Sequence, residues 1–280
     1  GVLTINAPFA SWFQISRIFA PNFLGWIADR SGEYIKWIKI SSFFGFIFFI
    51  GIFWANSFLS IFLIMMAMSI FTSSTLPLAE SLTLAHLKAN KADSKYSHIR
   101  LWGSIGFIVA AILLGIMIDS IGEKSLIYAL LLTQLVIFLL AFILPTKKVI
   151  FLPKKKRSIW PILKKREVVV LLLSCALMVS SHGLLYNFYS IFLEQQGYSG
   201  TTIGLLWAVG VIFEIIIFLL MPRILNKFTL KAVLLISLGF AVIRFFLIGA
   251  YVDSMILLFI AQVMHAATFG SFHVASIQLI

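Results

Sequence analysis

Long apolar stretches, separated by short polar ones, run along the whole chain. Charged residues are absent from 40–79, 101–118, 125–146 and 168–193. A helix needs about 20 residues to cross a hydrocarbon core of ~30 Å, so these runs are typical of membrane-spanning helices. The run 40–79 is long enough for two helices, with a break expected at Ala55-Asn56-Ser57. The pattern predicts nine spans, near 4–27, 37–55, 58–87, 99–118, 125–145, 168–193, 199–221, 231–251 and 254–278.

Composition excludes a soluble globular fold. Apolar residues make up 61% of the 280 residues and charged residues only 11%, with a mean hydropathy of +1.06. A soluble protein cannot hide that much apolar surface, because roughly half of any surface must face water. We therefore expect an all-α, polytopic membrane protein whose main partner is the lipid bilayer.

The net charge of +12 is concentrated in alternate loops. Of the 22 Lys and Arg residues, all but Arg17, Lys124 and Arg244 lie in four of the predicted loops and their edges. By the positive-inside rule these loops face the cytoplasm, which predicts a multi-pass protein of the cell (inner) membrane. Nucleic acid is not an expected partner, because the basic residues follow the loops rather than a folded surface with stacking aromatics. The basic loops are 30–39, 88–100, 147–166 and 223–231.

The polar segment 147–166 divides the chain into two halves. Gly-Trp-Ile-Ala-Asp-Arg-Ser-Gly at 25–32 in the first half has an echo in Pro-Arg-Ile-Leu-Asn-Lys at 222–227 in the second. If each motif follows the second helix of a six-helix repeat, residues 1–146 are an N-terminal bundle of helices 2–6. Residues 167–280 are then a C-terminal bundle of helices 7–10, joined by a cytoplasmic linker. We therefore expect nine of twelve helices, with the natural chain beginning before residue 1.

Three motifs resemble a known family. Gly25, Asp29, Arg30 and Gly32 resemble the loop 2–3 gating signature of the major facilitator superfamily, although Glu33 and Tyr34 replace its basic pair. In that reading the glycines let helices approach closely, while Asp29 and Arg30 fix an ion pair and helix-end contacts. Tyr-Ser-His-Ile-Arg-Leu-Trp-Gly-Ser-Ile-Gly-Phe at 96–107 resembles the opening of helix 5 in the lactose permease-like branch. His-Ala-Ala-Thr-Phe-Gly-Ser-Phe-His at 265–273 resembles helix 10 of the phenylpropionate transporter-like members.

The resemblance implies a substrate site. Arg100 and Glu80 map approximately onto the arginine and carboxylate that hold the sugar in lactose permease, and a guanidinium can bind a carboxylate or vicinal hydroxyls. Phe107 stands where the permease stacks a tryptophan on its sugar. Arg17 could line the entry path or pair with Glu80 or Glu214. Alternatively, Arg100 and Glu80 pair with each other and hold two helices together.

Ionisable residues near the bilayer midplane indicate proton coupling. Glu214 and Arg244 lie roughly 13 and 20 Å along their helices from the nearest cytoplasmic basic residue. Such charges are costly in a membrane and mark functional sites. Lactose permease has a carboxylate three residues after the histidine that matches His265, but this chain has Thr268 there. Glu214 is therefore the predicted proton site and Arg244 its partner, with His265 and His273 relaying protons or contacting substrate. A structural ion pair and packing histidines are the alternatives.

These features together predict a secondary transporter that works by alternating access. We expect proton-coupled symport of a small organic solute, such as an aromatic or carboxylic acid of the phenylpropionate kind. A sugar or nucleoside symporter and an uncoupled uniporter are alternatives. The proton would be the coupling ion, with no other cofactor and no metal, and the protein would act as a monomer. An enzyme is not expected because the chain lacks hydrolase and metalloprotease motifs. Scattered single charges also argue against a channel.

Overall fold

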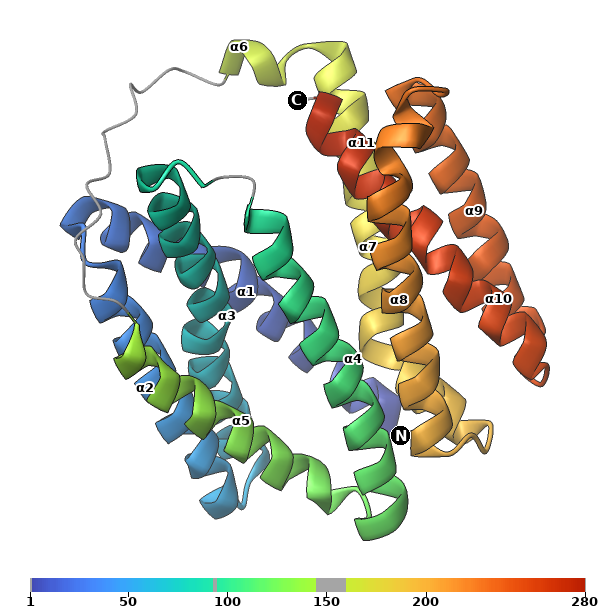
Figure 1. Ribbon diagram of the computed structural model, residues 1–280. Coiled ribbons are helices and arrows are strands. Elements are labelled where there is room, and N and C mark those ends of the chain that lie inside the picture. The colour runs from blue at the N-terminus through green and yellow to red at the C-terminus, as the bar shows by residue number, and fades with distance from the viewer. Residues whose placement is uncertain (1, 93–94, 145–159, 280) are drawn as a thin grey trace. The chain divides into compact units, whose positions relative to one another are not determined.

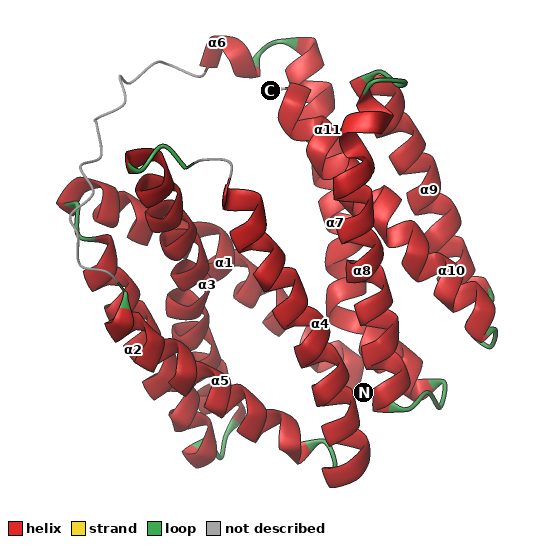
Figure 2. Cartoon of the chain, in the orientation of Figure 1, coloured by secondary structure: helices red, strands yellow, loops and turns green. Residues whose placement is uncertain are grey.

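The structure, a computed structural model, describes residues 2–92, 95–144 and 160–279. These residues are almost entirely helical and contain no strand (Figures 1 and 2). The elements are α1 (Val2–Ser31), α2 (Tyr34–Gly51), the 3₁₀ turn η1 (Ile52–Trp54), α3 (Phe58–Ala89), α4 (Tyr96–Ile121), α5 (Lys124–Ile143), α6 (Trp160–Leu163), α7 (Arg166–Gln195), α8 (Gly200–Leu225), α9 (Leu230–Ala250), α10 (Met255–His265), the π-helical segment η3 (Ala266–Ser271) and α11 (Phe272–Leu279).

Eight segments of the described chain are long and apolar enough to cross a membrane, and they match the predicted spans after the first. The last of them, 255–279, joins α10, η3 and α11 into one span. The predicted span 4–27 corresponds to α1. This helix is long enough to cross a membrane, as the eight segments are, but it is not one of them. Polar residues within it, such as Asn6, Gln14 and Arg17, account for its lower hydropathy.

The break expected at 55–57 is confirmed. The 3₁₀ turn ends at Trp54, and Ala55 has an extended backbone. Ser57 then caps α3 by accepting a hydrogen bond from the backbone N–H of Ser60, while the Ser60 side chain accepts from the backbone N–H of Ser57. This reciprocal capping satisfies backbone groups that a helix start leaves unpaired, so the long apolar run turns back as two helices.

The described residues form two compact units. Among the described residues, the first comprises 2–92, 95–98 and 127–144, with α1, α2, α3 and most of α5. Both α1 and α2 pack along α3, and Phe138 of α5 lies against the rings of Phe43 and Phe46 in α2. Burial of apolar side chains holds this unit together. Its core consists of Ala28, Tyr34, Ile38, Leu78, Leu82 and Ala141.

The second unit comprises the described residues 99–126 and 160–279, so that α4 groups with the helices after the linker. The predicted linker falls mostly on residues outside the described ranges. The units reflect packing rather than the sequence repeat, and the predicted boundaries at 146 and 167 stay a prediction.

Helix α4 joins the second unit through contacts of backbone with backbone. A Cβ atom added to Gly204 of α8 would stand 2.3 Å from the carbonyl oxygen of Ala111, and one added to Gly115 would stand 2.3 Å from that of Gly200. Gly115 and Gly204 therefore permit a close crossing of α4 and α8. Only glycine allows α4 and α8 to approach so closely, because any side chain would separate the helices. At Gly103, by contrast, an added Cβ would have no described atom within 4 Å.

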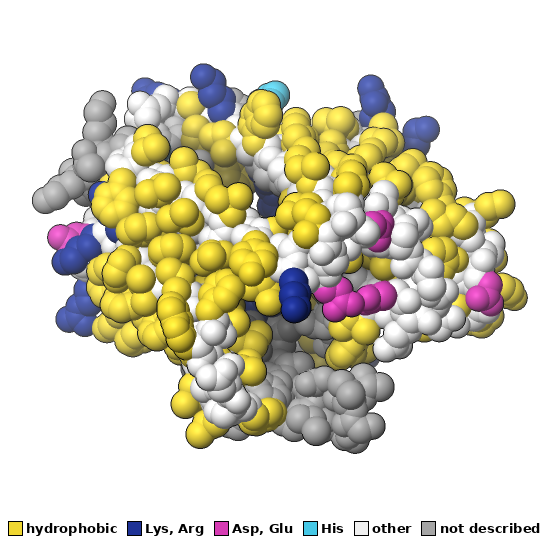
Figure 3. Space-filling model, turned by 90° about the horizontal axis from the view of Figure 1, so that it is seen from below, with side chains coloured by type: hydrophobic (Ala, Val, Ile, Leu, Met, Phe, Trp, Pro, Cys, Tyr) yellow, Lys and Arg dark blue, Asp and Glu magenta, His cyan; other side chains and the backbone are white. Residues whose placement is uncertain are grey.

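Large apolar side chains remain exposed on both units. Trp54, Trp102, Leu219 and Ile256 are each 73% exposed. Figure 3 shows hydrophobic side chains covering much of the face in view, with a few charged groups between them. In water such a surface would drive aggregation, whereas lipid tails solvate it.

Candidate functional site

A layer of buried polar side chains separates two apolar clusters in the second unit. His182 on α7, Arg244 on α9, and His265 and Thr268 on the last span are each at most 3% exposed. On each helix, apolar residues of one cluster precede the layer and residues of the other follow it. Polar groups buried at this depth are costly unless they bind one another, so the layer is a candidate functional site.

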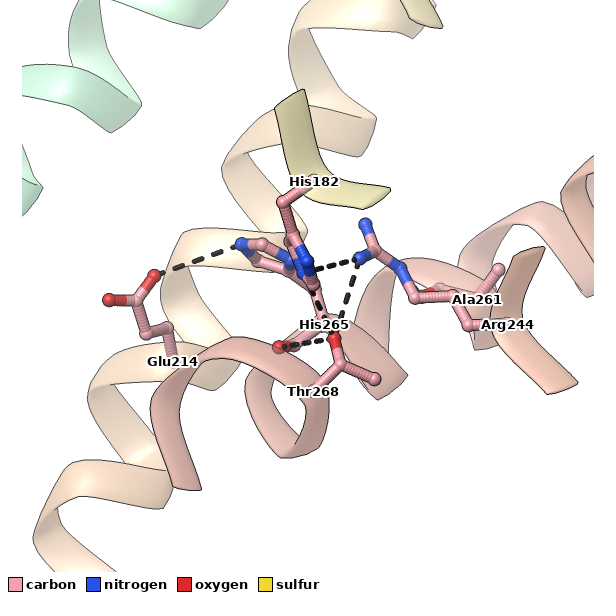
Figure 4. A network of polar contacts seen from close by, with 6 residues as sticks. All are labelled: His182, Glu214, Arg244, Ala261, His265 and Thr268. Carbon is pink, nitrogen blue, oxygen red and sulfur yellow. Dashed lines mark hydrogen bonds and ion pairs between the residues drawn. The ribbon is translucent and has the colours of Figure 1, made fainter. Parts of the chain in front are cut away.

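Arg244 is held by neutral acceptors (Figure 4). Its Nε donates a 3.0 Å hydrogen bond to the carbonyl oxygen of Ala261, and its Nη1 donates to Nε2 of His182 at 3.2 Å and to Oγ1 of Thr268 at 3.4 Å. The Thr268 hydroxyl itself donates to the carbonyl oxygen of His265 at 3.1 Å. No carboxylate among the described residues forms an ion pair with Arg244.

Glu214 contacts His265 instead. Its Oε2 lies 3.9 Å from Nε2 of His265, which is an ion pair when the histidine is protonated and is too long for a hydrogen bond. Arg244, predicted as the partner of Glu214, lies beyond the two histidine rings, and Figure 4 shows the arginine and the carboxylate on opposite sides of them.

Two glycines bring α8 close to the last span. A Cβ atom added to Gly210 would lie 3.1 Å from Oε1 of Gln262 and 3.4 Å from the His265 ring. One added to Gly270 would lie 2.6 Å from Ile217 and 3.4 Å from Glu214. Gly270 belongs to the π-helical segment, a distortion that is frequent at functional sites. The distance between Glu214 and His265 therefore depends on the absence of side chains at 210 and 270.

Aromatic rings continue the site along the last span and onto α7 and α8. Phe269 stacks between His265 and His273, with ring centroids 5.5 and 6.1 Å away. Tyr186 of α7 stacks on Trp207 of α8 at 5.8 Å. Phe107 of α4 meets Trp207 edge-on at 6.4 Å, so it extends this array of rings.

Arg100, also on α4, is exposed. The structure thus places Arg100, Phe107, Glu214, Arg244, His265 and His273 in one compact unit. Glu80 and Arg17 occupy exposed positions on α3 and α1 of the other unit, and their roles stay predictions.

The predicted gating motif lies at the C-terminal end of α1. Gly32 adopts a φ of +69°, and its backbone N–H donates to the Ala28 carbonyl at 2.9 Å, which ends the helix. Asp29 accepts a hydrogen bond from the Tyr34 hydroxyl, and the guanidinium of Arg30 lies 5.5 Å from the centre of the Trp26 ring. These aromatic partners take the place of the expected ion pair in the described chain.

The other glycine of the motif, Gly25, has no described atom within 4 Å of an added Cβ. The helix approach expected at this position therefore does not occur within the described unit.

The sequence analysis misses His182, as well as the rings of Tyr186 and Trp207. His182 lies in the middle of the uncharged run 168–193, at the depth that singles out His265 and Arg244. The same criterion, an ionisable side chain within a span, identifies it. The sequence does not indicate that His182 binds Arg244, because the two residues are 62 positions apart.

Membrane-length helices with ionisable side chains buried at mid-helix define a multi-pass membrane transporter. The chain belongs to the MFS_1 like family of the major facilitator superfamily, whose sequence model matches residues 11–280. The family confirms the resemblance suggested by the three sequence motifs.

Two relatives are transport proteins, which agrees with the expectation that the chain is not an enzyme. The chain is 28% identical to the "Probable 3-phenylpropionic acid transporter" of Escherichia coli (strain K12) over 284 residues, covering 99% of this chain and 72% of the relative. It is 26% identical to the "Maltose permease" of Geobacillus stearothermophilus over 172 residues, covering 61% of this chain and 43% of the permease.

The fold is that of a solved transporter. A crystal structure of a mutant of the nucleoside transporter NupG aligns with a TM-score of 0.79 at 19% identity, covering 97% of this chain and 72% of NupG. A second crystal structure of the nucleoside transporter NupG aligns with a TM-score of 0.72 at 21% identity, covering 95% of this chain and 71% of NupG. At these identities the likeness establishes the fold alone.

Proposed function

We propose that the protein is a proton-coupled symporter of a small organic acid that carries an aromatic ring. Substrate and proton bind together in one conformation and are released in another, by alternating access. The pairing of Glu214 with His265 inside a layer of buried polar side chains is the observation that carries this proposal.

Glu214 is the predicted proton carrier. Its side chain is 14% exposed, compared with 4% for His265, so the carboxylate is the member of the pair more open to proton exchange. Arg244 is bound by His182 and Thr268, so it leaves Glu214 free of a strong counter-ion in this conformation. A carboxylate held in this way can alternate between a protonated and an ionised form as its surroundings change.

The charge and the rings near Glu214 fit an aromatic acid. Arg100 is an exposed guanidinium that can bind a carboxylate through two parallel hydrogen bonds. Phe107, Trp207 and Tyr186 offer ring faces and edges to an aromatic substrate. 3-Phenylpropionate, the acid in the printed name of the Escherichia coli relative, has both groups.

In the same proposal the protein acts as a monomer in the cell (inner) membrane, with its basic loops in the cytoplasm. The proton is the coupling ion, and no other cofactor takes part. The alternation of basic loops along the chain supports this orientation.

The test is a pulse of substrate added to anaerobic, unbuffered cells that express the gene product and lack related carriers. Addition of 3-phenylpropionate should make the medium more alkaline, and Glu214→Gln should abolish that response. Glu194→Gln, at an exposed position near the end of α7, serves as the matched control and should respond as the wild type does.

Two other results would support the alternative functions, another substrate class or uncoupled transport. Alkalinisation with maltose or a nucleoside but not with the acid would replace the substrate class and keep the coupling. Saturable uptake of the acid without alkalinisation, unaffected by Glu214→Gln, would make the protein a uniporter.

A further inference from the structure

The two ring nitrogens of His182 have partners of opposite kind. Nδ1 lies 3.0 Å from the carbonyl oxygen of Met178, which can only accept a hydrogen bond. Nε2 lies 3.2 Å from Nη1 of Arg244, which can only donate, and 3.4 Å from the hydroxyl oxygen of Thr268. The bond from Arg244 therefore places the hydrogen on Nδ1 and a lone pair on Nε2, which is the neutral form of the ring.

The contact between His182 and Arg244 cannot survive protonation of the histidine. A proton on Nε2 would face an N–H of the guanidinium at 3.2 Å, donor against donor and positive charge against positive charge. Neither group can turn to water, because His182 is 2% exposed and Arg244 is fully buried. The position of Arg244 is therefore linked to the neutral state of His182.

The surroundings of His182 contain few ionisable groups. Tyr186 on its own helix, Arg244 on α9 and His265 on the last span face it, with the Tyr186 and His265 ring centroids 6.0 and 5.5 Å away. The carboxylate of Glu214, on α8, lies on the other side of His265. His182, Thr268 and the Ala261 carbonyl are thus the groups that hold Arg244 away from that carboxylate.

We propose that His182 is the positioning residue of the coupling site, accepting a hydrogen bond from Arg244 so that the guanidinium cannot pair with Glu214 while the carboxylate takes up its proton. This role rests on the proposed function. It adds a residue on α7 to a mechanism otherwise carried by α8, α9 and the last span. A side chain at 182 that cannot accept this bond should free Arg244 to pair with Glu214 and keep it ionised.

Two substitutions distinguish loss of the hydrogen bond to Arg244 from loss of the imidazole ring itself. In His182→Gln the amide oxygen reaches the place of Nε2 and can accept from Arg244. In His182→Asn the amide ends at the level of Nδ1 and cannot. His86→Asn is the matched control, because His86 makes the same bond to the carbonyl four residues earlier, at 2.9 Å from Leu82, and has no described arginine contact.

Two readouts are measured with labelled 3-phenylpropionate in cells that express the full gene product. The first is proton-coupled uptake as a function of external pH. The second is exchange of internal for external substrate, which needs no net release of the proton. In His182→Asn the pH of half-maximal uptake should fall by about one unit, equivalent to a tenfold change in proton affinity. Exchange should stay within about threefold of wild type, and His182→Gln and His86→Asn should behave as wild type does.

The outcomes are distinguishable. If the wild type is coupled and His182→Asn keeps its pH profile, the positioning role is overturned and the proposed function stands. If both variants at 182 lose exchange together with uptake, the residue is only structural and the role is again overturned. If the wild type takes up the acid without protons, the proposed coupling fails, and the role of His182 fails with it.

Discussion

The carboxylate of Asp119, near the end of α4, accepts a 2.7 Å hydrogen bond from the backbone N–H of Gly200, the first residue of α8. Its second oxygen accepts from the next N–H, that of Thr201, also at 2.7 Å. A negative charge at a helix start binds unpaired N–H groups and interacts favourably with the helix dipole. This bond ties α4 to the helix that carries Glu214.

Removal of that bond should weaken the attachment of α4. Asp119→Ala should lower the melting temperature of the purified protein in detergent, and Asp119→Asn should lower it less, because an amide oxygen can still accept one hydrogen bond. Differential scanning fluorimetry measures both. Equal melting temperatures for all three proteins would show that the bond does not contribute.

The crossing of α4 and α8 should tolerate no side chain. In Gly204→Ala the new methyl group meets the Ala111 carbonyl oxygen, so the helices must separate, at an expected cost of about 1–3 kcal/mol. Gly239→Ala on α9 is the control, since an added Cβ there has no described atom within 4 Å. Thermal melting of the two variants should differ, and similar values would contradict the close crossing.

Gly270 should matter for coupling through the position of Glu214. In Gly270→Ala the methyl group collides with Ile217 and presses on Glu214, so the distance from Glu214 to His265 should change. Proton-coupled uptake should fall about tenfold, and a second substitution, Ile217→Ala, should restore part of it by removing the colliding atom. Failure of the double variant to recover would mean that the loss has another cause.

Thr268 should make a modest contribution to the binding of Arg244. Thr268→Val keeps the shape of the side chain but removes the hydroxyl, which accepts from Nη1 of Arg244 at 3.4 Å and donates to the His265 carbonyl at 3.1 Å, while the bonds of Arg244 to Ala261 and His182 remain. The expected loss of stability is about 2 kcal/mol, typical of two hydrogen bonds. Chemical or thermal unfolding measures it, and a loss several times larger would show that Thr268 organises the whole network.

Phe107 should discriminate between aromatic and aliphatic acids. Phe107→Leu removes the ring that meets Trp207 and keeps apolar bulk, so KM for 3-phenylpropionate should rise about threefold to tenfold. KM for an aliphatic acid of similar length should change little. Competition of both acids against labelled substrate gives the ratio, and an equal change for both would remove Phe107 from the substrate site.

The sequence predicts the helices well because span length and apolar composition are local properties. The break before Phe58 is predictable for the same reason, since Asn56 and Ser57 interrupt an apolar run. Depth in the membrane is also predictable, because distance along a helix from a charged loop determines it. Depth alone singles out Glu214, Arg244 and His265, which the structure places in one compact unit.

The pairing within the site is not predictable from depth. Depth does not determine which way a side chain points around its helix, so Arg244 at the right level binds His182 rather than Glu214. The attachment of α4 to the second unit depends on Gly115, Gly200 and Gly204. Their effect appears only when two distant segments are brought together.

The charged side chains of the site are two arginines and one carboxylate. Arg100, Arg244 and Glu214 together leave one positive charge while the histidines are neutral, as the bonds of His182 require for that residue. Under the proposed function this surplus attracts anions whatever their shape. We then expect an amine of the same size as an aromatic acid to be repelled before any contact with the rings, so that the sign of the solute's charge is selected before its form.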